Sequence, residues 1–301
     1  MRLGFIGLGN LGTKLAASLL REGFSVTVHD LDRGNAADLI EAGAGWANSP
    51  RAVAEASDSV ITCLPSPQAV AAVMTGPNGV LNGLQAGGAW VEMSTNDLNE
   101  VKRLATLAME RDIATLEAPV TGGVHRAAAG EITVLVGGDK AVFETHLPAL
   151  KAMGGEVIHM GELGSASVIK VITNMLAFIH LIAAGEALML AKQGGLDLAT
   201  SFQAIKASSG NSFVHETESQ VILNGSYNIG FTMDLACKDL GFAEQIGRAF
   251  GVPLELAAQA ARIFEQARNA YGGDAWSPMV VKLLEDATGA ELRAPGFPAE
   301  L

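Results

Sequence analysis

The chain has 301 residues, of which 49% are hydrophobic and 17% charged, and its formal net charge is −12. This composition excludes a disordered chain, because enough apolar surface is present to bury a core. It also argues against a general nucleic-acid-binding protein, which would carry a basic face. The two cysteines, Cys63 and Cys237, lack metal-ligand spacing, and we expect reduced thiols in a cytoplasmic protein.

The first part of the chain alternates short apolar strands with helical stretches. The first predicted helix, 13–23, ends at Gly23, a typical helix C-cap. Strands separated by helices predict βαβ units and a mostly parallel sheet, that is, an α/β Rossmann-type doubly wound sheet. The predicted strands are 2–9, 25–30, 57–65, 88–94, 112–120, 130–138 and 155–161.

After Gly164 the strand signals nearly stop, and long helical patterns follow. The shift predicts a domain boundary near residue 162, with a dinucleotide-binding domain at 1–162 and an all-α domain at 163–301, built on its first long helix. That helix is apolar enough to imitate a membrane span, but polar residues along its length favour a buried helix of a soluble protein without membrane contact. The predicted helices are 165–193, 197–208, 234–250, 253–271 and 277–288.

A glycine-rich turn follows the first predicted strand. Gly7, Gly9 and Gly12 have the G-x-G-x-x-G spacing, with Leu8, Asn10 and Leu11 between them, and a helix follows. The first glycine permits the tight turn, the second lets the backbone approach a pyrophosphate, and the third lets helix and strand pack closely. The free N–H groups of the helix N-terminus would then face the phosphates. The alternative is a glycine-rich turn without a ligand.

An acidic residue ends the second strand, as this fingerprint requires. Asp30 lies 18 residues after Gly12, near the usual interval of about 20. Its carboxylate would bind the ribose hydroxyls and repel a 2′-phosphate, so NAD is favoured, although nearby Arg33 keeps NADP possible. Two later strand ends, Leu64–Pro65 and Ser94–Thr95, should border the cofactor, because ligands lie at the carboxyl ends of parallel strands. Ordinary loop chemistry is the alternative there.

Four motifs occur in order along the chain: GFIGLGNLG (4–12), EAPVTGG (117–123), GSASVIKVITN (164–174) and MDLACKDLGFA (233–243). Together they resemble the β-hydroxyacid dehydrogenases, which include 3-hydroxyisobutyrate dehydrogenase, tartronate semialdehyde reductase and, more distantly, 6-phosphogluconate dehydrogenase. The resemblance covers nearly the whole chain and implies a Rossmann domain, a helical domain built on a long interdomain helix, and a homodimer or homotetramer. It also implies oxidation of a small 3-hydroxy acid, or reduction of the semialdehyde, with NAD(P).

The resemblance also assigns site residues. The family's catalytic lysine falls on Lys170 and its partner asparagine on Asn174. The substrate-binding motif, usually Ser-Gly-Gly, is here Thr121-Gly122-Gly123, which keeps the hydroxyl and adds a methyl group. Where the family often has two consecutive asparagines, this chain has Thr173 and Asn174.

The chemistry of these side chains agrees with that assignment. Lys170 and Asn174 share one helix face, with Ser167 one turn earlier. Alcohol oxidation needs a base for the hydroxyl proton, and a lysine can serve if desolvation lowers its pKa. For an arbitrary helix, a solvated lysine would be the better interpretation.

Backbone N–H groups and the hydroxyl of the Thr-Gly-Gly loop could hold a substrate carboxylate. The resemblance places Lys238, which is followed by Asp239 on a later helix, near cofactor and substrate at a cleft, where it would supply positive charge. A surface lysine is the alternative there. Phe231 would add an apolar wall, and His125 lies next to the glycines without a predicted catalytic role.

Three other functions stay open. A short semialdehyde reductase, such as one acting on tartronate semialdehyde, would run the reaction in reverse. A non-catalytic dinucleotide-binding protein has no need of Lys170, and imine reductases on this scaffold commonly lack the lysine. The six histidines show no ligand spacing, so we expect no metal site.

Overall fold

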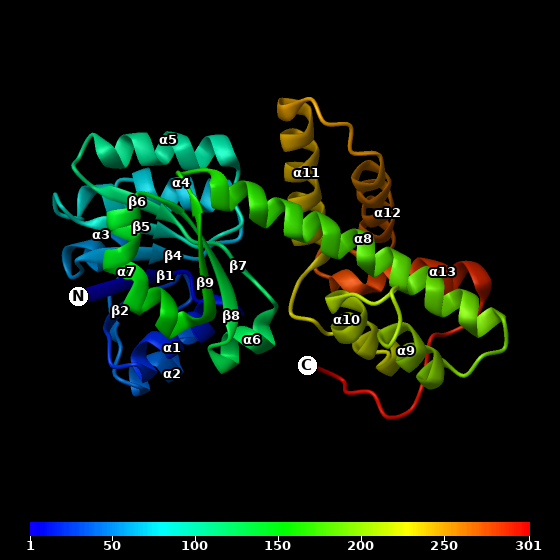
Figure 1. Cartoon of the computed structure of the whole chain (residues 1–301). Helices are drawn as coiled ribbons and strands as arrows, with labels where there is room; N and C mark the ends of the chain where they lie inside the picture. The colour runs from blue at the N-terminus through cyan, green and yellow to red at the C-terminus, as the bar shows by residue number, and fades with distance from the viewer. The chain divides into compact units, whose positions relative to one another are not determined.

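The computed structural model describes all 301 residues, which form two compact units, Met1–Lys170 and Val171–Leu301 (Figure 1). The division falls inside the long helix α8 (Ser165–Gln193), eight residues after the boundary that we predicted from composition. The first turns of α8 belong to the N-terminal unit because their backbone amides bond to a strand residue of its sheet, Glu117.

The N-terminal unit is built on one nine-stranded sheet, and the predicted Rossmann-type fold is confirmed. The strand order is β3-β2-β1-β4-β5-β6-β8-β7, with β9 also paired to β8. All neighbours from β3 to β6 are parallel, which places the ends of β1, β2, β4 and β5 at one edge. The strands are β1 (Arg2–Ile6), β2 (Ser25–His29), β3 (Gly45–Trp46), β4 (Ser59–Thr62), β5 (Ala89–Glu92), β6 (Ala114–Glu117), β7 (Val120–Thr121), β8 (Ile132–Gly138) and β9 (Gly154–Gly161).

One predicted strand is wrong in detail. Residues 112–120 were expected to form a single strand, but the structure has β6 and β7 with Ala118 and Pro119 between them. Both pair antiparallel with β8. The proline lacks an N–H and cannot continue a ladder, which explains the interruption. The break delivers Thr121 to the end of its own short strand.

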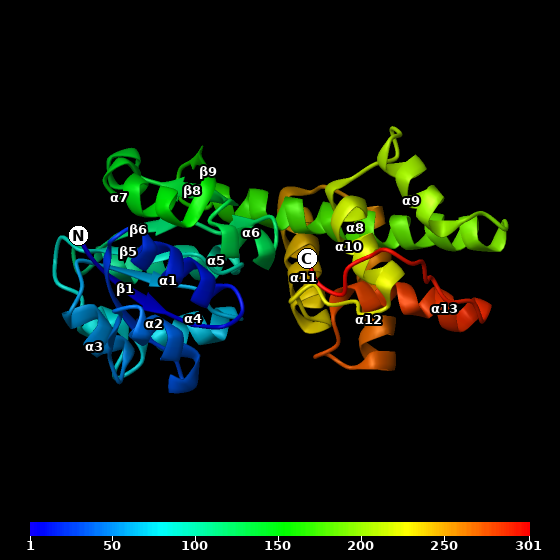
Figure 2. The same ribbon diagram turned by 90° about the horizontal axis from the view of Figure 1, so that it is seen from below.

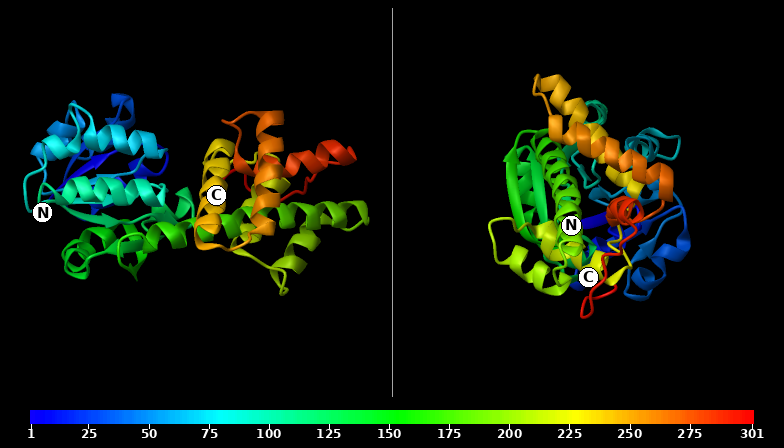
Figure 3. Two further views of the ribbon diagram at one scale, coloured as in Figure 1. Left: turned by 90° about the horizontal axis from the view of Figure 1, so that it is seen from above. Right: turned by 90° about the vertical axis from the view of Figure 1, so that its right-hand side faces the viewer.

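Helices cover both faces of the sheet. The helices α1 (Gly12–Arg21), α2 (Ala37–Glu41), α6 (Val124–Ala129) and α7 (Lys140–Met153) supply one apolar cluster, and α1 and α2 are seen from below in Figure 2. The helices α3 (Pro50–Glu55), α4 (Pro67–Thr75) and α5 (Leu98–Met109) supply the other, seen from above in Figure 3. Ser49 and Ser66 cap α3 and α4, each followed by proline, a strong helix-start signal.

The C-terminal unit is all helical, as predicted. Beyond α8 it contains α9 (Leu198–Lys206), α10 (Phe213–Asn224), α11 (Met233–Phe250), α12 (Glu255–Tyr271) and α13 (Lys282–Thr288), with the 3₁₀ helix η3 (Ser277–Val281) before α13. Phe178, Leu240 and Phe264 lie in its core. A Cβ on Gly185 would lie 2.5 Å from Val281, so this glycine lets α8 approach η3 closely.

Helix α10 was not predicted, and the predicted helix 277–288 is split into η3 and α13. The segment of α10 is polar, HETESQ, and lacks a clear apolar period. Its start is fixed instead by Ser212, whose hydroxyl accepts a hydrogen bond from the His215 N–H. Its buried face, which includes Val214 and Ile222, completes the core of the unit.

Candidate active site

The three glycines of the first loop are required for different reasons. Gly7 has φ +98°, and a Cβ there would lie 2.3 Å from the carbonyl oxygen of Cys63. A Cβ on Gly12 would lie 1.9 Å from the carbonyl oxygen of Gly7. A Cβ on Gly9 would meet nothing within 4 Å. Packing within the fold therefore requires glycine at residues 7 and 12. Gly9 instead borders open space, where the absence of a side chain lets a ligand approach the backbone.

The polar groups around this loop fit a dinucleotide. The amides of Leu11 and Gly12 at the start of α1 donate to no protein acceptor, so they can bind phosphate. Asp30 lies against the loop, because the Leu8 N–H donates to its Oδ2 at 2.7 Å. Its Oδ1 accepts from the Asn35 side chain at 3.2 Å, a contact that the sequence did not suggest.

A buried hydrogen-bond chain ties the next two strand ends together. The Leu64 N–H donates to Ser94 Oγ at 2.8 Å, and the Ser94 N–H donates to Glu92 Oε1 at 2.9 Å. The Thr62 hydroxyl donates to the other oxygen of Glu92. Pro65 and Thr95 follow these fixed residues directly, and the ideal Cβ position of Gly7 lies 2.8 Å from Leu64. The predicted cofactor residues that follow β1 and β4 therefore lie together. Glu92, whose carboxylate accepts the hydrogen bonds at these strand ends, was not predicted from the sequence.

The Thr-Gly-Gly segment forms an open loop between β7 and α6. Thr121 ends β7, and Gly122 and Gly123 have φ +124° and +90°, which only glycine adopts readily. His125 lies beside Gly123, and Arg126 lies over Gly122. Burial and, to a smaller extent, the neighbouring Arg126 guanidinium lower the pKa of His125.

A buried carboxylate holds the start of α8. Glu117, at the end of β6, accepts hydrogen bonds from the N–H groups of Gly164 at 2.6 Å and Ala166 at 2.8 Å, and from the Ser167 hydroxyl. A negative charge at a helix N-terminus is favourable, because the free amides there carry a partial positive charge. Lys170 follows one turn after Ser167, and its side chain is buried at 8% exposure.

Asn174 lies one turn beyond Lys170 and is buried as well. Its Nδ2 donates to Asp239 Oδ2 at 2.6 Å, and Asp239 Oδ1 lies 3.0 Å from Lys238 Nζ. The Lys238 ammonium also stands 5.1 Å from the ring centroid of Phe242. The structure thus unites Asn174 and Lys238 through Asp239, which is almost completely buried and which the sequence had not assigned to the site.

Comparisons with known proteins cover both units. Residues 2–161 match the family model described as the NAD-binding domain of 6-phosphogluconate dehydrogenase, and residues 164–284 match the model described as NAD-binding of NADP-dependent 3-hydroxyisobutyrate dehydrogenase. The chain belongs to the β-hydroxyacid dehydrogenase family. This dehydrogenase is 37% identical to 2-(hydroxymethyl)glutarate dehydrogenase of Eubacterium barkeri, with 97% of each chain covered.

Other relatives of the dehydrogenase agree. L-threonate dehydrogenase of Escherichia coli K12 is 33% identical, with 95% of each chain covered. A crystal structure of 3-hydroxyisobutyrate dehydrogenase from Salmonella typhimurium has a TM-score of 0.87 at 32% identity, with 94% of this chain and 99% of that chain covered. The protein is therefore an NAD(P)-dependent dehydrogenase that acts on the CH–OH group of a hydroxy acid, as the motifs predicted.

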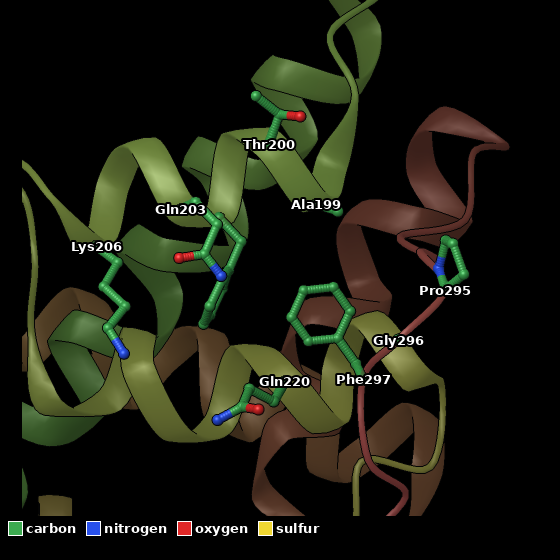
Figure 4. A pocket seen from close by; sticks show the side chains of 9 residues that line it. Ala199, Thr200, Gln203, Lys206, Gln220, Pro295, Gly296 and Phe297 are labelled. Atoms are coloured by element: carbon green, nitrogen blue, oxygen red, sulfur yellow. The ribbon is translucent and has the colours of Figure 1, made fainter.

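A separate pocket of about 470 Å³ lies in the helical unit of the dehydrogenase (Figure 4). No predicted site residue lines it. Lys206 reaches its rim but is paired with Glu216 at 3.0 Å. The pocket is an open hollow bordered by α9, α10 and the C-terminal tail, and its lining residues are Ala199, Thr200, Phe202, Gln203, Lys206, Gln220, Pro295, Gly296 and Phe297.

Proposed function

We propose that the enzyme interconverts a small 3-hydroxy acid of the 3-hydroxyisobutyrate type and its semialdehyde, with Lys170 as the proton-transfer residue. The observation that carries the proposal is the pair of buried polar side chains on α8. Lys170 is 8% exposed and Asn174 is 9% exposed, one helical turn apart. Lysine is seldom buried in a protein, and buried ionisable groups cluster at functional sites, so a role in the chemistry accounts for a buried lysine beside a hydrogen-bonded asparagine.

In the oxidative direction Lys170 Nζ takes the proton of the substrate hydroxyl while the carbonyl forms. Bound NAD(P) supplies the acceptor for the hydride that leaves the carbinol carbon. In the reductive direction the Lys170 ammonium returns the proton to the carbonyl oxygen. Asn174 orients the reacting oxygen, and its bond to Asp239 fixes the orientation of the carboxamide.

Thr121, Gly122 and Gly123 hold the substrate carboxylate in this proposal. Backbone amides in a loop of positive φ can converge on an anion, and the glycines permit close approach. Lys238 adds positive charge to the site, and Asp239 positions it by an ion pair. The threonine methyl group narrows the loop relative to the usual serine.

For the cofactor, we propose a preference for NAD over NADP. The carboxylate of Asp30 lies against the glycine loop, where it would accept hydrogen bonds from ribose hydroxyls and repel a phosphate. Arg33 follows Asp30 by three residues, and its positive charge would moderate that preference. The Arg33 guanidinium lies 5.6 Å from the ring centroid of Trp46.

The decisive experiment replaces Lys170 with alanine. We expect Lys170→Ala to lower kcat/KM for 3-hydroxyisobutyrate oxidation by about 10³-fold or more, because proton transfer to a positioned side chain contributes about 10²–10⁴-fold. NADH binding, followed by fluorescence, should persist. Lys192→Ala, an exposed lysine on the same helix, is the matched control. A Lys170→Ala enzyme with more than a tenth of wild-type activity would contradict the assignment.

Two alternatives remain distinguishable. A physiological semialdehyde reductase would use the same residues, and the ratio of forward to reverse kcat/KM at pH 7 decides the direction. A non-catalytic dinucleotide-binding protein would bind NADH but turn over no hydroxy acid. The buried position of Lys170 disfavours that alternative, because a binding protein has no use for a proton-transfer residue there.

We also propose a cytoplasmic homodimer or homotetramer assembled through α8. This helix is long and apolar enough to cross a membrane by composition. An 18-residue stretch of it has a mean hydropathy of 1.8, but only 33% of that stretch is buried within the chain. Ile172, Leu176 and Leu190 are exposed on it. A second copy of the chain would cover these side chains, and the mass in solution by light scattering decides between monomer and oligomer.

A further inference from the structure

An arginine beside the Thr-Gly-Gly loop has no assigned role. Arg126 lies on α6, and its side chain passes over Gly122. The ideal Cβ position of Gly122 lies 3.2 Å from Arg126 Cδ, 3.4 Å from Nη1 and 3.8 Å from Nε. The guanidinium therefore occupies the space that a side chain at residue 122 would fill, directly against the loop.

This guanidinium is half-buried and has no acidic partner. No carboxylate lies within ion-pair distance, and none of its N–H groups donates to a protein acceptor. In a chain with a net charge of −12, an unpaired and half-buried arginine is unexpected. Its field is felt by His125, whose pKa it helps to lower. The positive charge is thus available to a ligand.

The geometry points to Arg126 as the residue that binds a second anionic group of the substrate, and so to a hydroxy acid with two carboxylates. This inference rests on the proposed function, in which Thr121 and the loop amides already hold the carboxylate next to the reacting alcohol. A guanidinium beside that loop offers a planar pair of donors, which matches a further carboxylate. A monocarboxylate with a methyl branch would leave the charge unpaired.

Three hydroxy acids test the inference. 3-Hydroxyisobutyrate and 2-(hydroxymethyl)butanedioate share the same reacting half, and the second carries an additional carboxylate on the branch carbon. The corresponding branch amide has nearly the size of the diacid but no second charge. Each is assayed with the wild type, with Arg126→Gln and with Arg126→Lys, and NADH binding is titrated by fluorescence in all three proteins.

We expect the wild type to prefer the diacid over the branch amide. Arg126→Gln should lower kcat/KM for the diacid by about 10–100-fold, since a hydrogen bond to a charged group contributes about 1.5–3 kcal/mol. The amide and 3-hydroxyisobutyrate should change less than threefold, and Arg126→Lys should restore part of the preference.

Other results would overturn the inference in recognisable ways. Equal losses for all three substrates would place Arg126 on the shared carboxylate. Weakened NADH binding by Arg126→Gln would show that Arg126 binds the cofactor instead. Unchanged kinetics with all three substrates would show that Arg126 contacts none of them. In each case the proposed function stands, because the wild type still oxidises 3-hydroxy acids. A wild type that binds NADH and oxidises none of the three would refute the proposed function, and the inference with it.

Discussion

The carboxylate of Glu117 should determine how firmly the start of α8 is held. Its oxygens accept hydrogen bonds from the Gly164 and Ala166 amides and the Ser167 hydroxyl, all in a buried setting. Glu117→Ala leaves these three donors without an acceptor. Glu117→Gln keeps an amide oxygen for the two N–H groups, and its NH₂ can donate to the Ser167 oxygen. The two variants therefore separate lost hydrogen bonds from lost charge.

The magnitude follows from the number of donors. A hydrogen bond to a charged group contributes about 1.5–3 kcal/mol, and the three donors share one acceptor group, so we expect a loss of roughly 3–5 kcal/mol for Glu117→Ala. At about 2–4 °C per kcal/mol for a unit of this size, the unfolding midpoint should fall by roughly 6–20 °C. Glu117→Gln loses mainly the charge–dipole interaction, about 1 kcal/mol.

Thermal unfolding followed by scanning fluorimetry measures this difference. Glu156→Ala is the control, because Glu156 is an exposed glutamate in β9 of the same sheet. If Glu117→Ala unfolds within 2 °C of the wild type, the hydrogen bonds at the start of α8 do not stabilise it, and the reasoning fails. If Glu117→Gln is as damaging as alanine, the charge alone is responsible.

Two further predictions concern other parts of the chain. Gly9→Ala should weaken NADH binding at least about tenfold in a fluorescence titration, because the added Cβ would point into the space that the pyrophosphate needs. Its unfolding midpoint should stay near that of the wild type, because the Cβ meets no protein atom within 4 Å. Gly12→Ala should instead lower the midpoint, because its Cβ would lie 1.9 Å from the carbonyl oxygen of Gly7. Burial raises the pKa of Glu218 to about 8, and its Oε2 has no hydrogen-bond partner. The folded state therefore holds this proton up to about pH 8, while the unfolded chain releases it near pH 4.3, so stability falls as the pH rises through that window. Glu218→Gln should match the wild type at pH 4 and unfold several degrees higher at pH 9; parallel midpoint curves for the two proteins would contradict the burial argument.

Much of the fold could be predicted because its determinants are local. The glycine loop, the strand before it and Asp30 lie within the first 30 residues, and their spacing is fixed by the backbone geometry of one βαβ unit. Helix α10 could not be predicted, because its polar sequence is made helical by the Ser212 cap and by packing against the rest of its unit. The spacing of apolar residues along a segment indicates a helix only when the face that becomes buried is apolar along its whole length.

The site residues that the sequence missed are those defined by distant contacts. Glu117 bonds to the amide of Ala166, 49 residues later, and Asn174 bonds to Asp239, 65 residues later. No spacing rule connects such pairs, since they meet only after both elements have packed. In the sequence, Glu117 and Asp239 stand out only as acidic residues within largely apolar segments. That pattern is compatible with a buried carboxylate, but it does not identify the donor that binds it.

These two contacts bear on how α8 presents Lys170. Ser167 and Asn174 are seven residues apart, about two helical turns, and therefore lie on one face with Lys170 between them. Each is bonded to a buried carboxylate, Glu117 for the first and Asp239 for the second. Rotation of the helix about its axis would break both bonds, and each carboxylate would lose a buried donor, at a cost of about 1–3 kcal/mol for each bond. The face of α8 that carries Lys170 is therefore fixed by hydrogen bonds on either side of the lysine.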